Sequence, residues 1–214
     1  MKKNQRTELV FILDNSGSMH GLEADTIGGF NSMIQEQKEQ CGEAYVTTLL
    51  FNTHSKMIND RLPIQKVPEM TEREYRTCGS TALYDALGDA ITHIAGIHKY
   101  ARPEDVPQKT LFVITTDGME NASTRYGKGE VKNLIEKYKT QMGWEFLFLG
   151  ANIDAVQEAA KIGIQKERAV TFVNDSIGTA LNYKAVSRAV RDVRANQSID
   201  DDWADSIRNR DLNR

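Results

Sequence analysis

Short and almost uninterrupted apolar runs alternate along the chain with longer stretches in which apolar residues recur every three or four positions. Five of the short runs predict β-strands, at 8–13, 45–51, 109–116, 145–150 and 169–172. Two of them contain LVFIL and LFVI, which are nearly continuous in apolar residues, as expected for strands buried on both faces. The segment 56–64 predicts an edge strand, because Pro63 is tolerated only at the edge of a sheet.

Between these strands, apolar residues recur at the spacing of one helix face. The stripes consist of Ile27, Phe30, Ile34 and Cys41, of Leu83, Leu87, Ile91 and Ile94, and of Val131, Leu134, Ile135 and Tyr138. Gly143 and Gly163 follow two helical patterns at positions typical of left-handed C-terminal caps. A last helix is predicted to begin after residues 174–176, with an apolar stripe formed by Ile177, Leu181, Ala185, Ala189 and Val193.

Strands that alternate with helices predict an α/β fold. We expect a Rossmann-like, doubly wound and mostly parallel central sheet, with helices on both faces and one antiparallel edge strand. Residues 1–195 are predicted to form one domain. The last stretch, 196–214, is highly charged and has little periodicity, so it is predicted to be a mobile C-terminal tail in which Trp203 is the one candidate docking anchor.

Composition and charge narrow the class of protein. The 214 residues carry 27 basic and 30 acidic side chains. The resulting net charge of −3 gives the protein no overall electrostatic attraction to nucleic acid or to an anionic membrane. The apolar run at 9–13 is too short for a signal-peptide core or a membrane span, so a cytoplasmic location is expected. Cys41 and Cys78 lie in no CxxC or Cys/His cluster, and we interpret both as buried or incidental thiols.

Oxygen-bearing side chains gather where the predicted strands end. The first strand runs into DNSGS at 14–18, the strand at 109–116 runs into TDG at 116–118, and GST at 79–81 precedes a predicted helix. Ligands of an open α/β sheet bind beyond the carboxyl ends of its strands. We therefore expect these three segments to lie at one edge of the sheet.

These segments supply carboxylate and hydroxyl oxygens without imidazole or thiolate. Such donors suit a hard cation, Mg²⁺ first, with Mn²⁺ or Ca²⁺ as alternatives. Ser16 and Ser18 stand two residues apart, so their hydroxyls can face the same side of an extended loop. Asp14 and Asp117 balance the charge of a divalent ion, while neutral hydroxyls leave the ion electrophilic. The ion is therefore predicted to take a further anionic oxygen.

DNSGS, the threonine of GST and the aspartate of TTDG, in that order and at those strand ends, resemble the metal-ion-dependent adhesion site (MIDAS) of the von Willebrand factor type A (VWA) domain family. The order of strands and helices from about residue 8 to 193 is similar to the Rossmann-like fold of that family. The resemblance implies a complete set of family metal ligands, namely Asp14, Ser16, Ser18, Thr81 and Asp117.

The resemblance also implies a role for each ligand. Ser16 and Ser18 would bind the metal directly, Asp14 and Asp117 directly or through water, and Thr81 would join or leave with the state of the site. In the family, a Glu or Asp carboxylate of a partner protein commonly completes the metal. The compact, cysteine-poor chain looks most like the intracellular, microbial-type branch, whose domains act with AAA-type ATPases or other partners. The expected function is thus a noncatalytic, metal-dependent protein-binding module.

Two alternatives remain open at this point. DNSGS alone is also good turn or helix-cap chemistry, although a turn has no need of Thr81 and Asp117 at other strand ends. The second alternative is a metal-dependent phosphohydrolase or phosphotransferase with Asp14 as nucleophile. That enzyme needs a basic side chain to clamp charge, for which Arg76 and Arg125 are the nearest candidates. Asp25 and Glu120 lie near the same loops and are predicted to be surface or supporting residues.

Overall fold

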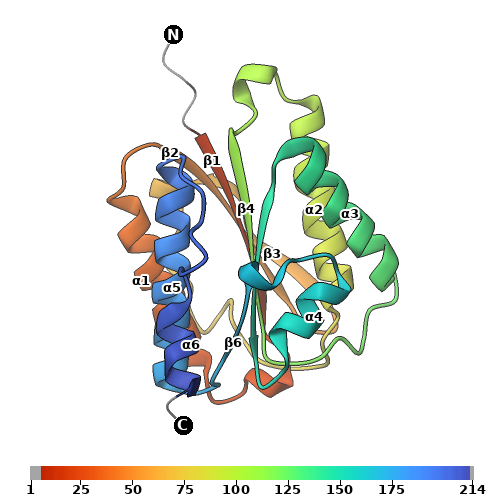
Figure 1. The fold of residues 1–214 in the computed structure, drawn as a ribbon, viewed down its shortest axis with the longest axis vertical. Coiled ribbons are helices and arrows are strands. Elements are labelled where there is room, and N and C mark those ends of the chain that lie inside the picture. Colours follow the sequence, from red (N-terminus) through yellow and green to blue (C-terminus); the bar gives the residue numbers. More distant parts are fainter. Residues whose placement is uncertain (1–5, 213–214) are drawn as a thin grey trace.

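The computed structural model describes residues 6–212, which form one twisted sheet between two layers of helices (Figure 1). The strands are β1 Arg6–Asp14, β2 Glu43–Phe51, β3 Ser55–Pro63, β4 Lys109–Thr116, β5 Glu145–Ala151 and β6 Ala169–Phe172. The helices are α1 Glu23–Lys38, α2 Leu83–Tyr100, α3 Lys128–Met142, α4 Ala155–Lys161, α5 Ser176–Arg194 and α6 Asp205–Leu212. Short 3-10 turns cover η1 Gly17–Met19, η2 Ile64–Lys66, η3 Pro103–Asp105 and η4 Lys166–Arg168.

The sheet has the strand order β3-β2-β1-β4-β5-β6. Every neighbouring pair is parallel except β2 and β3. The predicted fold class, with one antiparallel edge strand ending at Pro63, is therefore confirmed. Because β1 and β4 are central and parallel, their carboxyl ends open at the same edge of the sheet.

Strand β1 is buried on both faces, as its continuous apolar run predicts. Leu9, Phe11 and Leu13 belong to the core on the side of α1, α5 and α6, whereas Val10 and Ile12 belong to the core on the side of α2, α3 and α4. Figure 1 shows these two groups of helices on opposite faces. The alternation fixes the register of the strand, because a shift by one residue would exchange the two faces.

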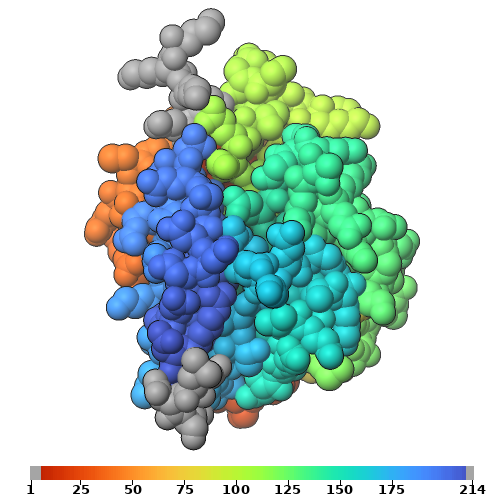
Figure 2. Space-filling view, in the orientation of Figure 1, coloured from red at the N-terminus to blue at the C-terminus, as the bar shows by residue number. Residues whose placement is uncertain are grey.

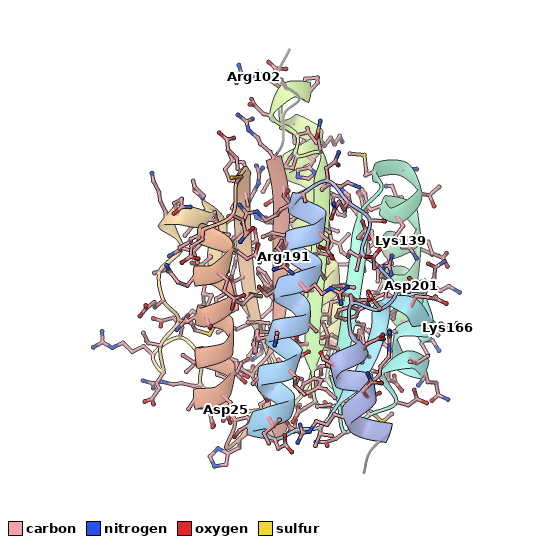
Figure 3. All side chains as sticks on the ribbon, turned by 60° about the vertical axis from the view of Figure 1, so that its left-hand side comes forward. Asp25, Arg102, Lys139, Lys166, Arg191 and Asp201 are labelled. Atoms are coloured by element: carbon pink, nitrogen blue, oxygen red, sulfur yellow. The ribbon has the colours of Figure 1, made fainter. Side chains whose placement is uncertain are left out.

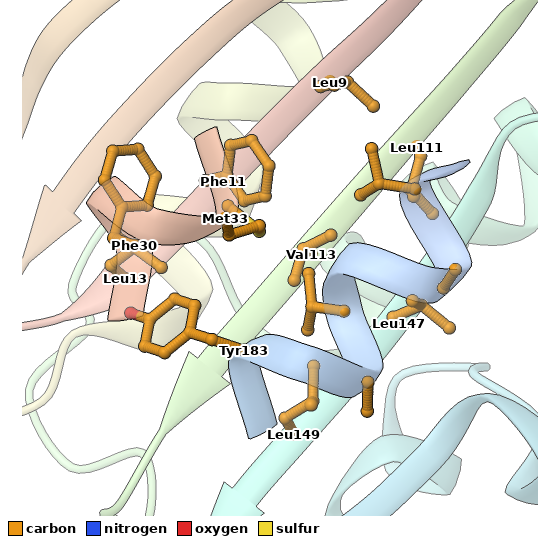
Figure 4. Packing of buried hydrophobic residues seen from close by; sticks show 14 of the residues in the cluster. Leu9, Phe11, Leu13, Phe30, Met33, Leu111, Val113, Leu147, Leu149 and Tyr183 are labelled. Carbon is orange, nitrogen blue, oxygen red and sulfur yellow. The ribbon is translucent and has the colours of Figure 1, made fainter. Parts of the chain in front are cut away.

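On one face, α1 and α5 close over the middle of the sheet (Figure 4). The rings of Phe11 and Phe30 meet edge to face at 5.5 Å between centroids. Next to them, Tyr183 of α5 lies directly over Gly29 of α1, where a Cβ atom would stand only 2.2 Å from the ring carbon Cδ2. Gly29 is therefore required by the close approach of the two helices rather than by a turn.

Alanine at the two adjacent glycines of α1 should have opposite effects on stability. Gly29→Ala is expected to destabilise the protein by about 1–3 kcal/mol, because the new methyl group overlaps the Tyr183 ring. Gly28→Ala has open space around its Cβ atom and should stabilise by roughly 0.5–1 kcal/mol, because alanine is the better helix former. Urea midpoints of both variants measure this difference, and equal midpoints would contradict the packing described here.

Two helix ends agree with the sequence prediction and one position does not. Gly143 follows α3 with φ +63, and Gly163 follows α4 with φ +81, both in the left-handed region. Helix α5 begins at Ser176, where the side chain of Asp175 accepts a hydrogen bond from the amide of Gly178 at 2.7 Å. The buried stripe predicted for α5 is wrong at Ile177, which is 64% exposed, because the first turn of the helix buries Gly178 and Thr179 instead.

The mobile tail predicted for residues 196–214 is wrong as far as residue 212. Ile199, Trp203, Ala204 and Ile207 are at most 2% exposed and belong to the same core as α1 and α5. The indole Nε1 of Trp203 donates to the carbonyl oxygen of Glu167 at 2.9 Å. Figure 2 shows this C-terminal segment filling the surface beside α5. Residues 213–214 lie outside the described part.

Burial of its apolar side chains drives the packing of this segment, and ion pairs with the rest of the fold accommodate its many charges. Arg168 pairs with Asp201 at 3.0 Å, Arg188 pairs with Asp202 at 2.9 Å, and Arg210 of α6 pairs with Asp175 at 2.7 Å. The charges that indicated a solvated tail are thus distributed around its apolar residues and face partners on other elements. The core does not end at residue 195.

Two further predictions concern the cysteines and the membrane. Cys41 and Cys78 are free thiols, so no disulfide joins them, and both are exposed rather than buried.

None of the helices within residues 6–212 combines the length and apolar character that crossing a membrane requires.

Candidate metal site

The site is built where β1 and β4 end side by side. Leu13 pairs with Thr115 in the parallel register, so Asp14 comes to lie beside Thr116. The hydroxyl of Thr116 donates to Oδ2 of Asp14 at 2.5 Å, and the amide of Ser16 donates to Oδ1 of Asp14 at 2.7 Å. Both carboxylate oxygens of Asp14 are therefore oriented by the strand ends themselves.

The serines of the first loop reach the aspartate that follows β4. Oγ of Ser16 and Oγ of Ser18 are 3.1 Å apart, so the two hydroxyls do face the same side. Ser18 Oγ donates to Oδ1 of Asp117 at 2.5 Å, although the two residues are 99 positions apart in the chain. The structure thus brings together four of the five predicted ligands through direct contacts.

Thr81 lies at the same edge of the sheet, in the loop at 79–81 that precedes α2. The amide of Gly17 donates to the carbonyl oxygen of Gly79 at 3.0 Å, which fastens this loop to the first one. A Cβ atom at Gly118 would lie 3.0 Å from Oγ1 of Thr81 and 3.5 Å from Oγ of Ser18. Gly118 therefore leaves room in which these hydroxyls and the adjacent Asp117 can face one another. All five predicted ligands lie at one edge.

The electrostatics of the site favour a cation. Asp14 is 1% exposed and Asp117 is 5% exposed. Burial raises the pKa of the Asp14 carboxyl, with hydrogen bonds from Thr116 and Ser16 acting in the opposite direction. Burial also raises the pKa of Asp117, and the nearby charge of Asp14 adds to that rise. Two ionised carboxylates in this position repel each other, and a bound divalent cation would relieve the repulsion.

The donor set fits a hard cation and not a soft one. It consists of two carboxylates and three hydroxyls, which are the ligands that Mg²⁺, Mn²⁺ and Ca²⁺ prefer. Within residues 6–212, no cluster of three or more His, Cys, Asp or Glu side chains is placed to hold a metal. A metal at this edge would therefore depend on Ser16, Ser18 and Thr81 as well as on the two aspartates.

Three supporting residues were not anticipated from the sequence. Thr116 orients Asp14, the hydroxyl of Tyr75 donates to the carbonyl oxygen of Asp14 at 2.5 Å, and Nδ2 of Asn174 donates to Oδ2 of Asp117 at 3.3 Å. Thr116 directly precedes Asp117 at the end of a buried strand, so a local signal existed for it. Tyr75 and Asn174 reach the site from separate loops, for which no local pattern gives a signal.

Asp25 and Glu120 support neighbouring loops, as predicted. Oδ2 of Asp25 accepts a hydrogen bond from the hydroxyl of Ser176 at 2.7 Å, and Figure 3 shows Asp25 at the end of the molecule where α5 begins. The carboxylate of Glu120 accepts hydrogen bonds from the amides of Tyr84, Ala122 and Ser123. Asp25 therefore joins the first turns of α1 and α5 through side chains, whereas Glu120 holds backbone amides next to the site.

Comparison with known proteins supports the fold. No protein-family model matches the chain, and no curated protein matches it. A solved structure of proximal thread matrix protein 1 from the mussel byssus, with a zinc-occupied MIDAS motif, is 15% identical with a TM-score of 0.60 over 87% of this chain and 46% of that chain. A von Willebrand factor type A protein from Catenulispora acidiphila is 14% identical, with a TM-score of 0.56 over 85% of this chain and 42% of that chain.

The chain shares the Rossmann-like α/β fold of these solved structures. BatB from Bacteroides thetaiotaomicron agrees, with 15% identity and a TM-score of 0.52 over 89% of this chain and 100% of that chain. The chain spans less than half the length of the mussel protein, whose solved structure has a zinc-occupied MIDAS motif. At these identities the likeness is one of fold alone.

Proposed function

We propose that this protein is a noncatalytic protein-binding module that acts through a divalent metal. Asp14, Ser16, Ser18, Thr81 and Asp117 hold Mg²⁺, and an acidic side chain of a partner protein completes it. The observation that carries the proposal is the contact of Ser18 with Asp117 at 2.5 Å, because it joins two distant loops in one set of oxygen donors. A turn formed by DNSGS alone would not require that contact.

The charge balance explains why a partner carboxylate belongs to the site. Asp14 and Asp117 neutralise a divalent ion, whereas the hydroxyls of Ser16, Ser18 and Thr81 add no charge. The metal therefore keeps affinity for one more anionic oxygen, which a Glu or Asp of a partner supplies. Mn²⁺ or Ca²⁺ can take the place of Mg²⁺ with the same donors.

The alternative, a phosphohydrolase or phosphotransferase, has less support. Asp14 is almost fully buried, and each of its carboxylate oxygens already accepts a hydrogen bond, which leaves a poor nucleophile. Arg125 forms a bidentate pair with Asp89 at 2.6 and 2.7 Å, and Nε of Arg76 donates to the carbonyl oxygen of Glu72. These contacts direct both candidate clamping residues elsewhere.

We propose a protein as the partner, and neither nucleic acid nor a membrane. The net charge of −3 provides no general attraction for a polyanion. From the family resemblance, an AAA-type ATPase in the cytoplasm is the partner class that we expect.

Calorimetric titration with Mg²⁺ tests the metal. Wild-type protein should bind one ion, and Asp14→Ala or Asp117→Ala should weaken binding by about 100-fold, because each removes a charged ligand contributing on the order of 2–3 kcal/mol. Asp105→Ala is the matched control, since Asp105 pairs with Arg6 and Arg102 far from this edge. Wild-type protein should also be stabilised by about 2.7 kcal/mol at 100 times the dissociation constant.

Two results would decide against the proposal. Equal Mg²⁺ binding by wild type and both aspartate variants would show that the metal does not use this edge. Hydrolysis of p-nitrophenyl phosphate that depends on Mg²⁺ and disappears in Asp14→Ala would favour the phosphohydrolase instead.

A further inference from the structure

A groove beside the edge strand β3 is separate from the candidate metal site. It has a volume of about 650 Å³ and lies between Ile58 and Asn59 of β3 and the loop at 68–74. Asn59 pairs with Thr48 in the middle of β2. The groove therefore lies beside the middle of the edge strand and not at the strand ends where the five predicted ligands gather.

A β-bulge places an unpartnered acceptor among the lining residues. The pairing of β2 with β3 passes from Thr48 and Asn59 to Leu49 and Met57, so Ile58 is the extra residue of the bulge. Nδ2 of Asn59 donates to Oγ1 of Thr48 at 3.2 Å. Its Oδ1 has no hydrogen-bond partner within residues 6–212, although Asn59 is only 4% exposed. Because a buried acceptor without a donor is unfavourable, this oxygen favours a ligand that donates a hydrogen bond.

The opposite wall of the groove is held in place by hydrogen bonds. Nδ2 of Asn31 in α1 donates to the carbonyl oxygen of Met70 at 2.9 Å, and the amide of Met70 donates to Oδ1 of Asn31 at 2.8 Å. The amide and the hydroxyl of Thr71 donate to Oε2 of Glu74 at 2.9 and 2.6 Å. The loop is thus fixed to α1 and to itself, and the groove is preformed.

The lining of the groove is acidic. It contains three glutamates and one arginine, namely Glu69, Glu72, Glu74 and Arg73. Hydrogen bonds within the loop lower the pKa of Glu74, and the charge of nearby Lys56 acts in the same direction. The carboxylates of Glu69 and Glu72, and the guanidinium of Arg73, form no hydrogen bond or ion pair with the part of the chain that the structure describes. The groove therefore keeps a net negative charge, which favours a cation.

We infer that this groove docks an arginine side chain from an exposed segment of a partner protein. A guanidinium has five N–H donors and a permanent positive charge, so it suits the free Oδ1 of Asn59 and the carboxylates of Glu69 and Glu72. Its aliphatic stem can lie against Ile58 and Met70. The groove is larger than one side chain, which leaves room for the backbone on either side of the arginine. The inference is independent of the proposed function, because none of these residues belongs to the metal site.

Two peptides that differ by one charge test the groove. The probes are acetyl-Gly-Arg-Gly-amide and acetyl-Gly-citrulline-Gly-amide, titrated into ¹⁵N-labelled full-length protein with a chelator present. Binding is followed by the NMR shifts of the amides at 58–59 and 69–74. Wild type should bind the arginine peptide about tenfold more tightly, because citrulline has nearly the same shape but lacks the charge that strengthens hydrogen bonds to carboxylates.

Two variants test the groups that would hold the arginine. Glu69→Gln with Glu72→Gln removes exposed charge and should bind the two peptides with affinities within about twofold of each other. Asn59→Leu removes the acceptor and should weaken binding of the arginine peptide by about fivefold. Glu136→Gln with Glu167→Gln is the matched control, since it removes the same charge from surface pairs on α3 and η4 and should keep the tenfold preference.

Thermal unfolding of each variant reports whether the fold is intact, and the double glutamine variant keeps the test decisive if Asn59→Leu does not fold. Equal affinities of wild type for the two peptides would overturn the docking site. A full tenfold preference in the double glutamine variant would overturn it as well. Because the chelator is present throughout, neither result bears on the proposed metal-dependent function.

Discussion

Trp203→Ala is expected to destabilise the protein by about 3–5 kcal/mol, the range found when a buried aromatic side chain is truncated in a core. Trp203 is 1% exposed and is among the largest fully buried side chains of the described part. Its removal leaves a cavity beside Ile199 and Ile207 and also breaks the hydrogen bond to the carbonyl oxygen of Glu167. For a chain of this size, the melting temperature should fall by roughly 10 °C.

Two variants separate packing from the other contacts of the segment. Trp203→Phe keeps an aromatic ring but loses the hydrogen bond to Glu167. The lost hydrogen bond should lower the free energy of unfolding by about 1 kcal/mol, in addition to the effect of the smaller ring on packing. Arg188→Ala breaks the exposed pair with Asp202 and should cost less than about 1 kcal/mol. Urea unfolding and circular dichroism measure all three. A melting temperature unchanged in Trp203→Ala would mean that the mobile tail predicted from the sequence is correct after all.

Asp117→Asn should remove nearly all of the stabilisation by Mg²⁺, about 2.7 kcal/mol at 100 times the wild-type dissociation constant. Without metal, Asp117→Asn should be as stable as wild type or more stable, with a gain of at most about 1 kcal/mol. The physical reason is that Asp117 and Asp14 are both buried and repel each other, and the amide removes one of the two charges. A site kept for binding thus lowers the stability of the metal-free protein.

Thermal unfolding of both proteins, with chelator and with Mg²⁺, measures this opposite behaviour. Asp105→Asn is the control, because its carboxylate pairs with Arg6 and Arg102 at the surface and should leave the response to Mg²⁺ unchanged. If Asp117→Asn were stabilised by Mg²⁺ as strongly as wild type, the metal would have to be bound elsewhere.

Most of the sheet could be predicted because its strands are locally distinctive. LVFIL is apolar without interruption because β1 is buried on both faces, and Pro63 marks the one edge strand that runs antiparallel. The ligand segments could be found for the same reason, since DNSGS and TDG come directly after such strands. That these segments meet follows from the parallel order of the sheet.

In the C-terminal segment, a helical spacing of apolar residues is obscured by the surrounding charges. Ile199, Trp203 and Ile207 are spaced by four residues, as on one face of a helix, but the many charges around them favour a solvent-exposed segment. Its ion pairs are made with Arg168 and Arg188, which belong to other elements. The apolar surface that buries Ile199, Trp203 and Ile207 also belongs to other elements, and the segment's own sequence does not contain it.

The fold class and the residues of the candidate site could be inferred from the sequence, because both depend on short-range features, namely the period of apolar residues and the side chains at strand ends. Other features emerge only from the packed fold: Tyr75 and Asn174 support the two aspartates, Gly29 must lack a side chain beneath Tyr183, and Ile177 is exposed. Each of these features depends on a segment that is distant in the chain and adjacent in the fold. The strand order and the helix packing determine which segments become neighbours.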